Sequence, residues 1–280
     1  MSYSAEISRQ NPSCILFVID QSESMIDTMP GIESTSKAAF LATVINRNLQ
    51  DLVIKCSRGE GVRDYFSVGV IGYGATVGPA FSGSLADKPL YMLSEVADNP
   101  ARIEDRTRKV SDGAGGLVEE TIKFPIWFDP VARNGTPMCE ALGLAHSVIS
   151  GWLAEHPDCF PPVVLHLTDG QSTDGNPLDA MQALTSLSSS DGNVVLFSIH
   201  ISSNPNARGI QFPGQSDQLP DPFAQTLFVG SSPLTSFMRS VAHDDYGMQL
   251  SDSARAFVMN AGDTWLVAAI DIGTRPSNLR

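Results

Sequence analysis

The chain has 280 residues, 42% of them apolar and 18% charged, proportions typical of a globular protein with a sizeable core. Its formal net charge of −13 argues against nucleic acid and anionic membranes as partners, because both require a basic surface. The sequence contains no apolar stretch of membrane-spanning length and begins with a polar segment unlike a signal peptide, so we expect a soluble cytoplasmic protein.

The first part of the chain predicts two buried strands separated by a helix. Residues 14–19, "CILFVI", form a continuous apolar run, which is typical of a strand covered on both faces. Residues 34–56 carry apolar side chains at helical spacing and predict an amphipathic helix. Residues 65–74, "YFSVGVIGYG", predict a second strand that ends in glycines.

Residues 79–133 have a less regular pattern, and we interpret them as an insertion. Within it, residues 98–116 have balanced acidic and basic side chains, which favours a solvated loop or a short helix on the rim. Short strands are expected near residues 117–124 and 126–130.

Regular patterns return with a strong helix over residues 136–156, for which Thr136 is a good N-cap and Pro137 suits the first helical position. Several further segments follow in order: a buried strand "PVVLHLTDG", a helix "PLDAMQALTSLSS", a buried strand "NVVLFSIHI", a long surface loop over 202–222, the apolar run "TLFVG", a helix over 234–243, the run "AFVMN", and a last helix with Asp263 as its N-cap.

Buried strands that alternate with amphipathic helices predict an α/β fold, with a doubly wound, mostly parallel sheet covered by helices on both faces. One such sheet can occupy the whole length, so we expect a single domain over residues 1–280. Its core would span about 13–202, with the irregular insertion at 79–133 and a C-terminal elaboration at 203–280.

Oxygen-bearing side chains follow the predicted strands where ligands of doubly wound sheets bind, outside the carboxyl ends. Asp20, Ser22 and Ser24 follow the first strand, Asp169 follows the strand "PVVLHLT", and Thr136 opens a helix. If the two strands are neighbours, these groups converge. Carboxylates and hydroxyls without sulfur or imidazole suit a hard cation such as Mg²⁺.

Each of these residues also has a simpler explanation. The two serines suit a helix-entry loop with hydroxyl caps, and Asp169 followed by glycine suits a plain turn. Three more acidic residues close to the site in sequence, Asp27, Asp174 and Asp179, are interpreted as solvated loop charges rather than ligands.

The chain resembles a von Willebrand factor A (VWA) domain with a metal-ion-dependent adhesion site, of the bacterial stand-alone type. The resemblance covers residues 13 to about 202 and is looser beyond. It departs from better-known members at Gln21 and Glu23, where glycine or another small residue is common. The motif positions that match the family are Asp20, Ser22, Ser24, Thr136 and Asp169.

The resemblance implies a Rossmann-like VWA fold and a Mg²⁺ site, with Mn²⁺ or Ca²⁺ as other candidates. It also implies that the hydroxyls ligate directly, while the aspartates can act through water. The cation would complete its shell with an Asp or Glu of a partner protein, so the expected role is recognition in a signalling or stress-response assembly, without catalysis. Without metal, Asp20 and Asp169 would lie close together and under-compensated, which predicts a like-charge cost.

Two rival functions remain open. A metal-dependent phosphohydrolase of the haloacid dehalogenase type would also place an aspartate at this strand end, but Ser22 stands where its second aspartate should be. A self-assembling structural module is the other alternative, and the sequence leaves the oligomeric state open.

The remaining histidines and aromatic residues predict packing. His166 and His200 lie within buried strands, where a core hydrogen bond is the expected role. Trp127 and Phe128 are expected to pack the insertion onto the body.

Overall fold

A computed structural model describes the chain over residues 3–32, 34–59, 61–111, 116–201, 208–260 and 263–274. Over these ranges no helix combines the length and the apolar character needed to cross a bilayer.

The central feature of the described residues is an eight-stranded sheet in the order β13-β14-β12-β9-β1-β4-β5, with β6 also paired to β4. Strands β14, β12, β9, β1 and β4 run parallel, whereas β13, β5 and β6 are antiparallel additions at the edges. The predicted α/β class with a mostly parallel sheet is therefore confirmed. In chain order the strands are β1 (Ser13–Asp20), β4 (Phe66–Tyr73), β5 (Val77–Pro79), β6 (Leu90–Met92), β9 (Val163–Thr168), β12 (Val195–His200), β13 (Ile210–Gln211) and β14 (Phe257–Met259).

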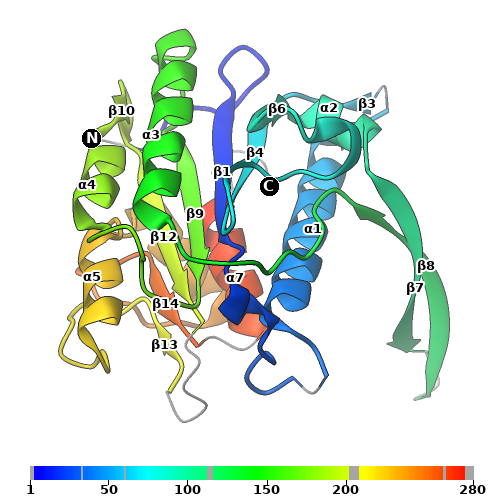
Figure 1. Cartoon of the computed structure of the whole chain (residues 1–280). Helices are drawn as coiled ribbons and strands as arrows, with labels where there is room; N and C mark the ends of the chain where they lie inside the picture. Colours follow the sequence, from blue (N-terminus) through cyan, green and yellow to red (C-terminus); the bar gives the residue numbers. More distant parts are fainter. Residues whose placement is uncertain are drawn as a thin grey trace.

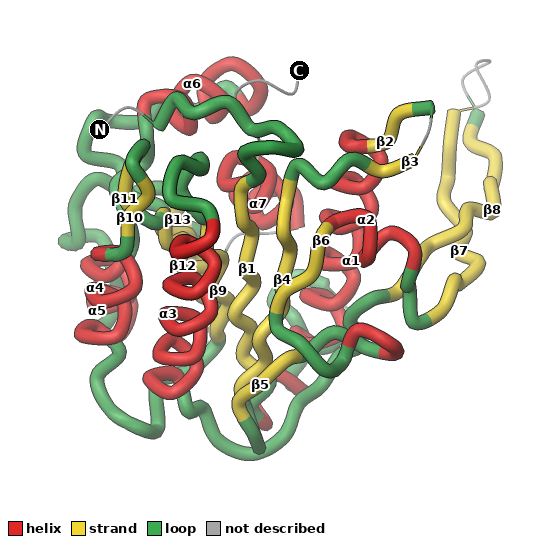
Figure 2. Tube along the Cα trace, turned by 90° about the horizontal axis from the view of Figure 1, so that it is seen from above, coloured by secondary structure: helices red, strands yellow, loops and turns green. Residues whose placement is uncertain are grey.

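Helices cover both faces of this sheet (Figures 1 and 2). One face packs against α1 (Lys37–Cys56), α2 (Leu93–Asp98), α6 (Ser236–Tyr246) and α7 (Asp263–Thr274), and the other against α3 (Met138–Glu155), α4 (Leu178–Ser186) and α5 (Pro222–Gly230). Strand β1 shows why both faces must be covered, because its alternate side chains enter two separate apolar clusters. The first cluster receives Ile15, Phe17 and Ile19, and the second receives Cys14, Leu16 and Val18.

A long two-stranded ribbon projects from the side of the body beyond α1 and α2 (Figures 1 and 2). It consists of β7 (Arg102–Ser111) and β8 (Leu117–Ile126), paired in antiparallel register. The expected loop or short helix over 98–116 is therefore wrong where β7 lies, whereas residues 112–115 lie outside the described residues. The strand near 117–124 is confirmed. Charged residues occur on both faces of the ribbon, so the alternation that marks a half-buried strand is missing, and cross-strand pairs such as Asp105 with Lys123 stabilise it instead.

The strand expected at 126–130 is also wrong, because β8 ends at Ile126 and the chain then turns inward. The backbone N–H groups of Trp127 and Phe128 both donate to Asn46 Oδ1, at 2.8 and 3.0 Å, and both side chains are buried. The prediction that these two aromatic residues pack the insertion onto the body is confirmed.

The structure adds detail to or departs from the predicted elements at four places. Helix α3 begins at Met138, so Pro137 is its N-cap, and Thr136 lies one residue before it. The described part of the expected loop over 202–222 contains β13, whereas residues 202–207 lie outside the described residues. The run "TLFVG" belongs to α5, and Asp263 is the first residue of α7 rather than its cap.

Short elements complete the described chain. These are the 3-10 helices η1 (Glu23–Ile26) and η2 (Gly83–Leu85), and the two-residue strands β2 (Ser57–Arg58), β3 (Gly61–Val62), β10 (Ser188–Ser189) and β11 (Gly192–Asn193).

Candidate functional site

Two acidic residues emerge side by side at the carboxyl end of the sheet. Strands β1 and β9 are parallel neighbours, with Ile19 opposite Leu167, so Asp20 and Asp169 lie just past paired positions. They are 1% and 5% exposed. The convergence of these two carboxylates, which the sequence predicted only if the strands were neighbours, is confirmed by the register.

The carboxylate of Asp20 is held by hydrogen bonds on both oxygens. Ser22 donates its backbone N–H to Oδ1 at 2.9 Å, and the Thr168 hydroxyl donates to Oδ2 at 2.8 Å. Burial raises the pKa of Asp20 most, these hydrogen bonds lower it, and the nearby Asp169 raises it further. A cation beside this group would therefore relieve an unfavourable buried charge.

The two serines of the first loop connect Asp20 to Asp169. Ser22 Oγ lies 3.1 Å from Ser24 Oγ, and the Ser24 hydroxyl donates to Asp169 Oδ1 at 2.7 Å. Glu23, between them, points its side chain to solvent. The alternate spacing of the serines thus turns both hydroxyls inward and leaves the charged residue outside.

Thr136 reaches the same place from a different loop. A Cβ on Gly170 would lie 3.9 Å from both Thr136 Oγ1 and Ser24 Oγ, so the two hydroxyls flank the same glycine. The loop before α3 is tied to the loop after β1, because Arg133 N donates to Gln21 O at 2.7 Å.

This tie explains one of the glycines that end β4. A Cβ on Gly74 would lie 2.6 Å from Gln21 O and 2.8 Å from Arg133 O, closer than a side chain allows. A glycine is therefore needed where the two loops meet.

The N-terminus of α3 is capped from a distance by Asp174. Its two carboxylate oxygens accept the backbone N–H groups of Cys139 and Glu140 at 3.0 and 2.9 Å. Burial acts to raise the pKa of Asp174, but the hydrogen bond from the Ser172 hydroxyl and these two backbone hydrogen bonds outweigh it and lower the pKa. Asp174 is exposed and lies in a loop, as predicted, but it also caps a helix, which the sequence analysis did not predict. No sequence pattern marks such a cap, because it lies 35 residues from the helix start that it satisfies.

A lysine in the cluster was missed by the sequence reasoning. Lys37, the first residue of α1, has a side chain only 1% exposed, and its Nζ lies 2.7 Å from Asp169 Oδ2 and 3.7 Å from Asp27 Oδ2. A signal was present, since Lys37 precedes Phe40 and Leu41 by three and four residues and so lies on the apolar face of the helix. Lys37 offsets the charge of Asp169, which the sequence analysis did not predict, but the predicted like-charge cost remains at Asp20, whose pKa is raised further by the nearby Asp169.

The donor set at this end of the sheet fits a hard divalent cation. Its side-chain donors are two carboxylates and three hydroxyls, all oxygens, and the Ser24 hydroxyl already bridges toward Asp169. Among the described residues no group of three or more His, Cys, Asp or Glu side chains is placed to hold a metal ion.

The two buried histidines belong to the core of the sheet. Tyr73 Oη lies 2.8 Å from His166 Nε2, and burial, together with His200, lowers the pKa of His166 to about 3. Burial also lowers the pKa of His200, which packs edge-on against Phe223. The prediction of a core hydrogen bond is confirmed for His166.

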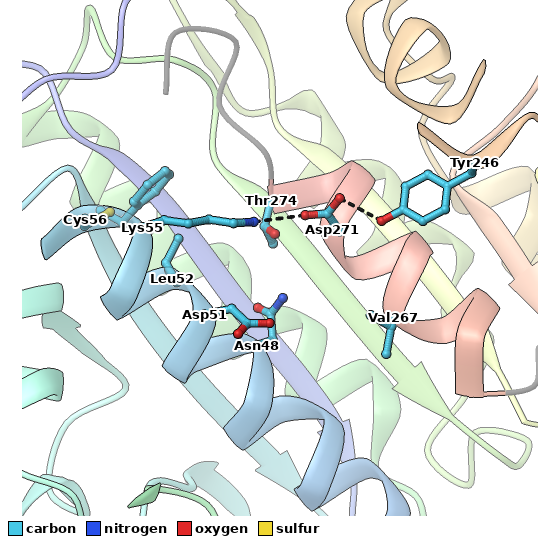
Figure 3. A pocket seen from close by; sticks show the side chains of 10 residues that line it. Asn48, Asp51, Leu52, Lys55, Cys56, Tyr246, Val267, Asp271 and Thr274 are labelled. Atoms are coloured by element: carbon cyan, nitrogen blue, oxygen red, sulfur yellow. Dashed lines mark hydrogen bonds and ion pairs between the residues drawn. The ribbon is translucent and has the colours of Figure 1, made fainter. Parts of the chain in front are cut away.

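A separate pocket lies at the opposite end of α1, against α6 and α7 (Figure 3). It has a volume of about 220 Å³. Asp271 lies at its rim, where Lys55 Nζ contacts Oδ1 at 3.1 Å and the Tyr246 hydroxyl donates to Oδ2 at 2.8 Å. Lys55 and Asp271 pair with each other there, and the pocket is remote from Asp20 and Asp169.

Comparison with known proteins shows similarity of fold only. No protein-family model matches the chain, and no curated protein matches it. Solved structures with a related arrangement include the vWF domain of the type V pili tip protein Mfa5 from Porphyromonas gingivalis, with 13% identity and a TM-score of 0.30 over 58% of this chain and 39% of that one. The pilus adhesin SpaC from Lactobacillus rhamnosus GG has 13% identity and a TM-score of 0.46, covering 96% and 30% of the two chains. The PilB minor pilin from Streptococcus sanguinis has 11% identity and a TM-score of 0.44, covering 93% and 60%.

In each of these three cases the match spans less than two thirds of the other chain. With all three TM-scores below 0.5, the matches carry no argument about function, which has to be argued from the site itself.

Proposed function

We propose that the chain is a VWA-like protein-binding module, in which a divalent cation held at the carboxyl end of the sheet captures an acidic residue of a partner protein. The observation that carries the proposal is the convergence of buried carboxylates and inward-turned hydroxyls from three separate segments. The residues assigned to the cation are Asp20, Ser22, Ser24, Thr136 and Asp169. Mg²⁺ is the first candidate, with Mn²⁺ or Ca²⁺ as alternatives.

The roles of these residues follow from their contacts. Asp20 has hydrogen bonds on both oxygens, so it orients Ser22 and Thr168 and supplies negative charge. The hydroxyls of Ser24 and Thr136 flank Gly170, a residue without a side chain to fill the space between them. A bound cation would supply Lewis acidity toward an incoming carboxylate, and the protein would supply the fixed oxygens that position it.

The phosphohydrolase alternative is disfavoured by the state of Asp20. A nucleophilic aspartate must expose one oxygen to the substrate, whereas Asp20 is 1% exposed and both its oxygens accept hydrogen bonds. We therefore propose a non-enzymatic role, and we place it in the cytoplasm as part of the same proposal.

The test combines metal titration with partner capture. Thr136→Val removes the hydroxyl but keeps the side-chain shape. It also leaves intact the hydrogen bonds of the Thr136 backbone, whose N–H donates to Thr173 Oγ1 at 3.0 Å and whose carbonyl accepts from Thr173 N at 2.9 Å. We expect calorimetry to show Mg²⁺ or Mn²⁺ binding to the wild type and at least about tenfold weaker binding to this variant and to Asp20→Ala. A pull-down from host lysate should retain the partner in Mg²⁺ and lose it in EDTA and with Thr136→Val.

Thr185→Val is the matched control, because the Thr185 hydroxyl donates to Met181 O within its own helix, away from the site. It should bind metal and partner as the wild type does. A partner retained equally in EDTA and by Thr136→Val would show that the cation is not the contact.

A further inference from the structure

Lys37 occupies an unfavourable position for a cation. It begins α1, where the helix dipole is positive, and its side chain is buried, so burial and dipole both oppose its charge. A residue in this position persists only where carboxylates compensate it. Here the compensation comes mainly from Asp169, at 2.7 Å, and secondarily from Asp27, at 3.7 Å.

The lysine is held in place by the backbone around it. Lys37 N donates to Asp27 O at 2.9 Å, and Thr28 and Ser36 form an isolated β-bridge, which closes the loop between η1 and α1 at its base. The Ser36 hydroxyl accepts the Ala39 N–H at 3.1 Å and caps the helix. The ammonium group therefore belongs to the folded cluster, in contrast to a surface lysine that can swing into solvent.

Asp169 is consequently shared between two kinds of partner. Its Oδ1 accepts from Ser24, a proposed ligand, and its Oδ2 faces Lys37. The buried charges at the centre of the cluster are then two carboxylates and one ammonium, for a formal sum of −1 rather than −2. A divalent cation bound there changes this sum to +1.

From this arrangement we infer that Lys37 is an affinity-setting residue of the site. Its fixed positive charge competes with the divalent cation for Asp169, weakens metal binding, and leaves the loaded site with a net positive charge that attracts an acidic partner. This inference rests on the proposed function, because it assumes that a cation binds beside Asp169. It adds that Lys37 lowers the metal affinity of the site and, once metal is bound, strengthens the attraction of the site for an acidic partner.

The experiment replaces Lys37 with neutral residues and titrates the purified full chain with MgCl₂ and MnCl₂ alone. Lys37→Met removes the charge and the hydrogen bond, whereas Lys37→Gln keeps a donor toward Asp169 and gives a second variant where the first does not fold. We expect both to bind Mg²⁺ roughly tenfold or more tightly than the wild type, because like charges a few ångströms apart repel strongly in a buried site. Their melting temperatures should also rise more on adding metal.

Two controls separate charge from packing. Lys37→Arg keeps the charge and should bind metal within about threefold of the wild type. Lys55→Met removes a lysine from the other end of the same helix, where the side chain is 51% exposed, and should leave the affinity unchanged.

The possible outcomes are distinguishable. If the wild type binds metal and neither neutral variant binds it more tightly, the inference about Lys37 is wrong while the metal site stands. If the wild type, Lys37→Met and Lys37→Gln are all folded by circular dichroism and none binds either cation at millimolar concentration, the proposed metal site and the inference both fail.

Discussion

Helix α1 carries a lysine–aspartate pair at each end, and the two pairs differ in nearly every physical respect. At its start, Lys37 and Asp169 have side chains 1% and 0% exposed. At its end, Lys55 and Asp271 have side chains 51% and 14% exposed, on the rim of the pocket in Figure 3. The nitrogen–oxygen distances of the two pairs are similar, 2.7 and 3.1 Å, but their interaction energies differ, because water screens the Lys55–Asp271 pair and not the Lys37–Asp169 pair. Burial, rather than the presence of an ion pair, marks the end of the helix where the function is proposed.

The largest expected effect comes from removing the buried carboxylate. Asp169→Asn leaves the shape of the side chain but strands the Lys37 charge, so we expect a loss of about 3–5 kcal/mol in the free energy of unfolding, measured by urea denaturation in EDTA. Asp27→Asn is the control, because the side chain of Asp27 is 58% exposed and 3.7 Å from the same ammonium, and it should cost about 1 kcal/mol or less. Equal stability of Asp169→Asn and the wild type would mean that the buried pair is not a significant source of stability.

Much of this arrangement was predictable from the sequence, for identifiable reasons. The buried strand before Asp20 and the alternate serines are local patterns, so both the strand end and the inward hydroxyls could be predicted. The meeting of Asp20 with Asp169 depended on strand order, which the sequence constrained only through the rule that ligands gather at strand carboxyl ends.

The residues that were missed act across long separations in the chain. Lys37 pairs with a carboxylate 132 positions away, and Asp174 caps a helix from outside it. The β7 strand was missed for a local reason, because charged residues occur on both of its faces and hide the period of two that marks a half-buried strand. The spacing of apolar residues along one helix or strand indicates which of its faces is buried. It does not indicate which distant residue forms an ion pair or a cap with that element.

An intermediate effect on stability is expected from the protonation of His166, which is buried and, in contrast to Lys37, has no ion-pair partner among the described residues. Burial lowers the pKa of His166 to about 3, below its ordinary value of 6.5, so the folded protein resists protonation that the unfolded chain accepts. The stabilising contribution is complete above pH 6.5 and is lost as the pH falls toward 3.

Between pH 6.5 and 4.5 we expect this group to account for a loss of roughly 2–3 kcal/mol in the free energy of unfolding. His166→Gln, which keeps a polar partner for Tyr73, should flatten that part of the stability profile, as measured by urea titrations at several pH values. His243→Gln is the control, since its side chain is 59% exposed. Parallel profiles for the wild type and His166→Gln would rule out the histidine as the source.

The smallest effect is expected at the exposed end of α1, and it decides whether the comparison between the two ends is correct. Asp271→Asn removes the charge that pairs with Lys55, but the amide can still accept from the Tyr246 hydroxyl, now 2.8 Å from the carboxylate. Because the lysine is half exposed, its ammonium can return to water. We therefore expect a loss of about 1 kcal/mol or less in the free energy of unfolding, and screening should make the loss smaller still in about 0.5 M salt.

Tyr246→Phe tests the other contact, since burial raises the pKa of this phenol and its hydrogen bond to Asp271 is partly shielded from water. If Asp271→Asn cost as much as Asp169→Asn, exposure would not be what separates the two ends of the helix, and the special place given to Lys37 would lose its main physical support.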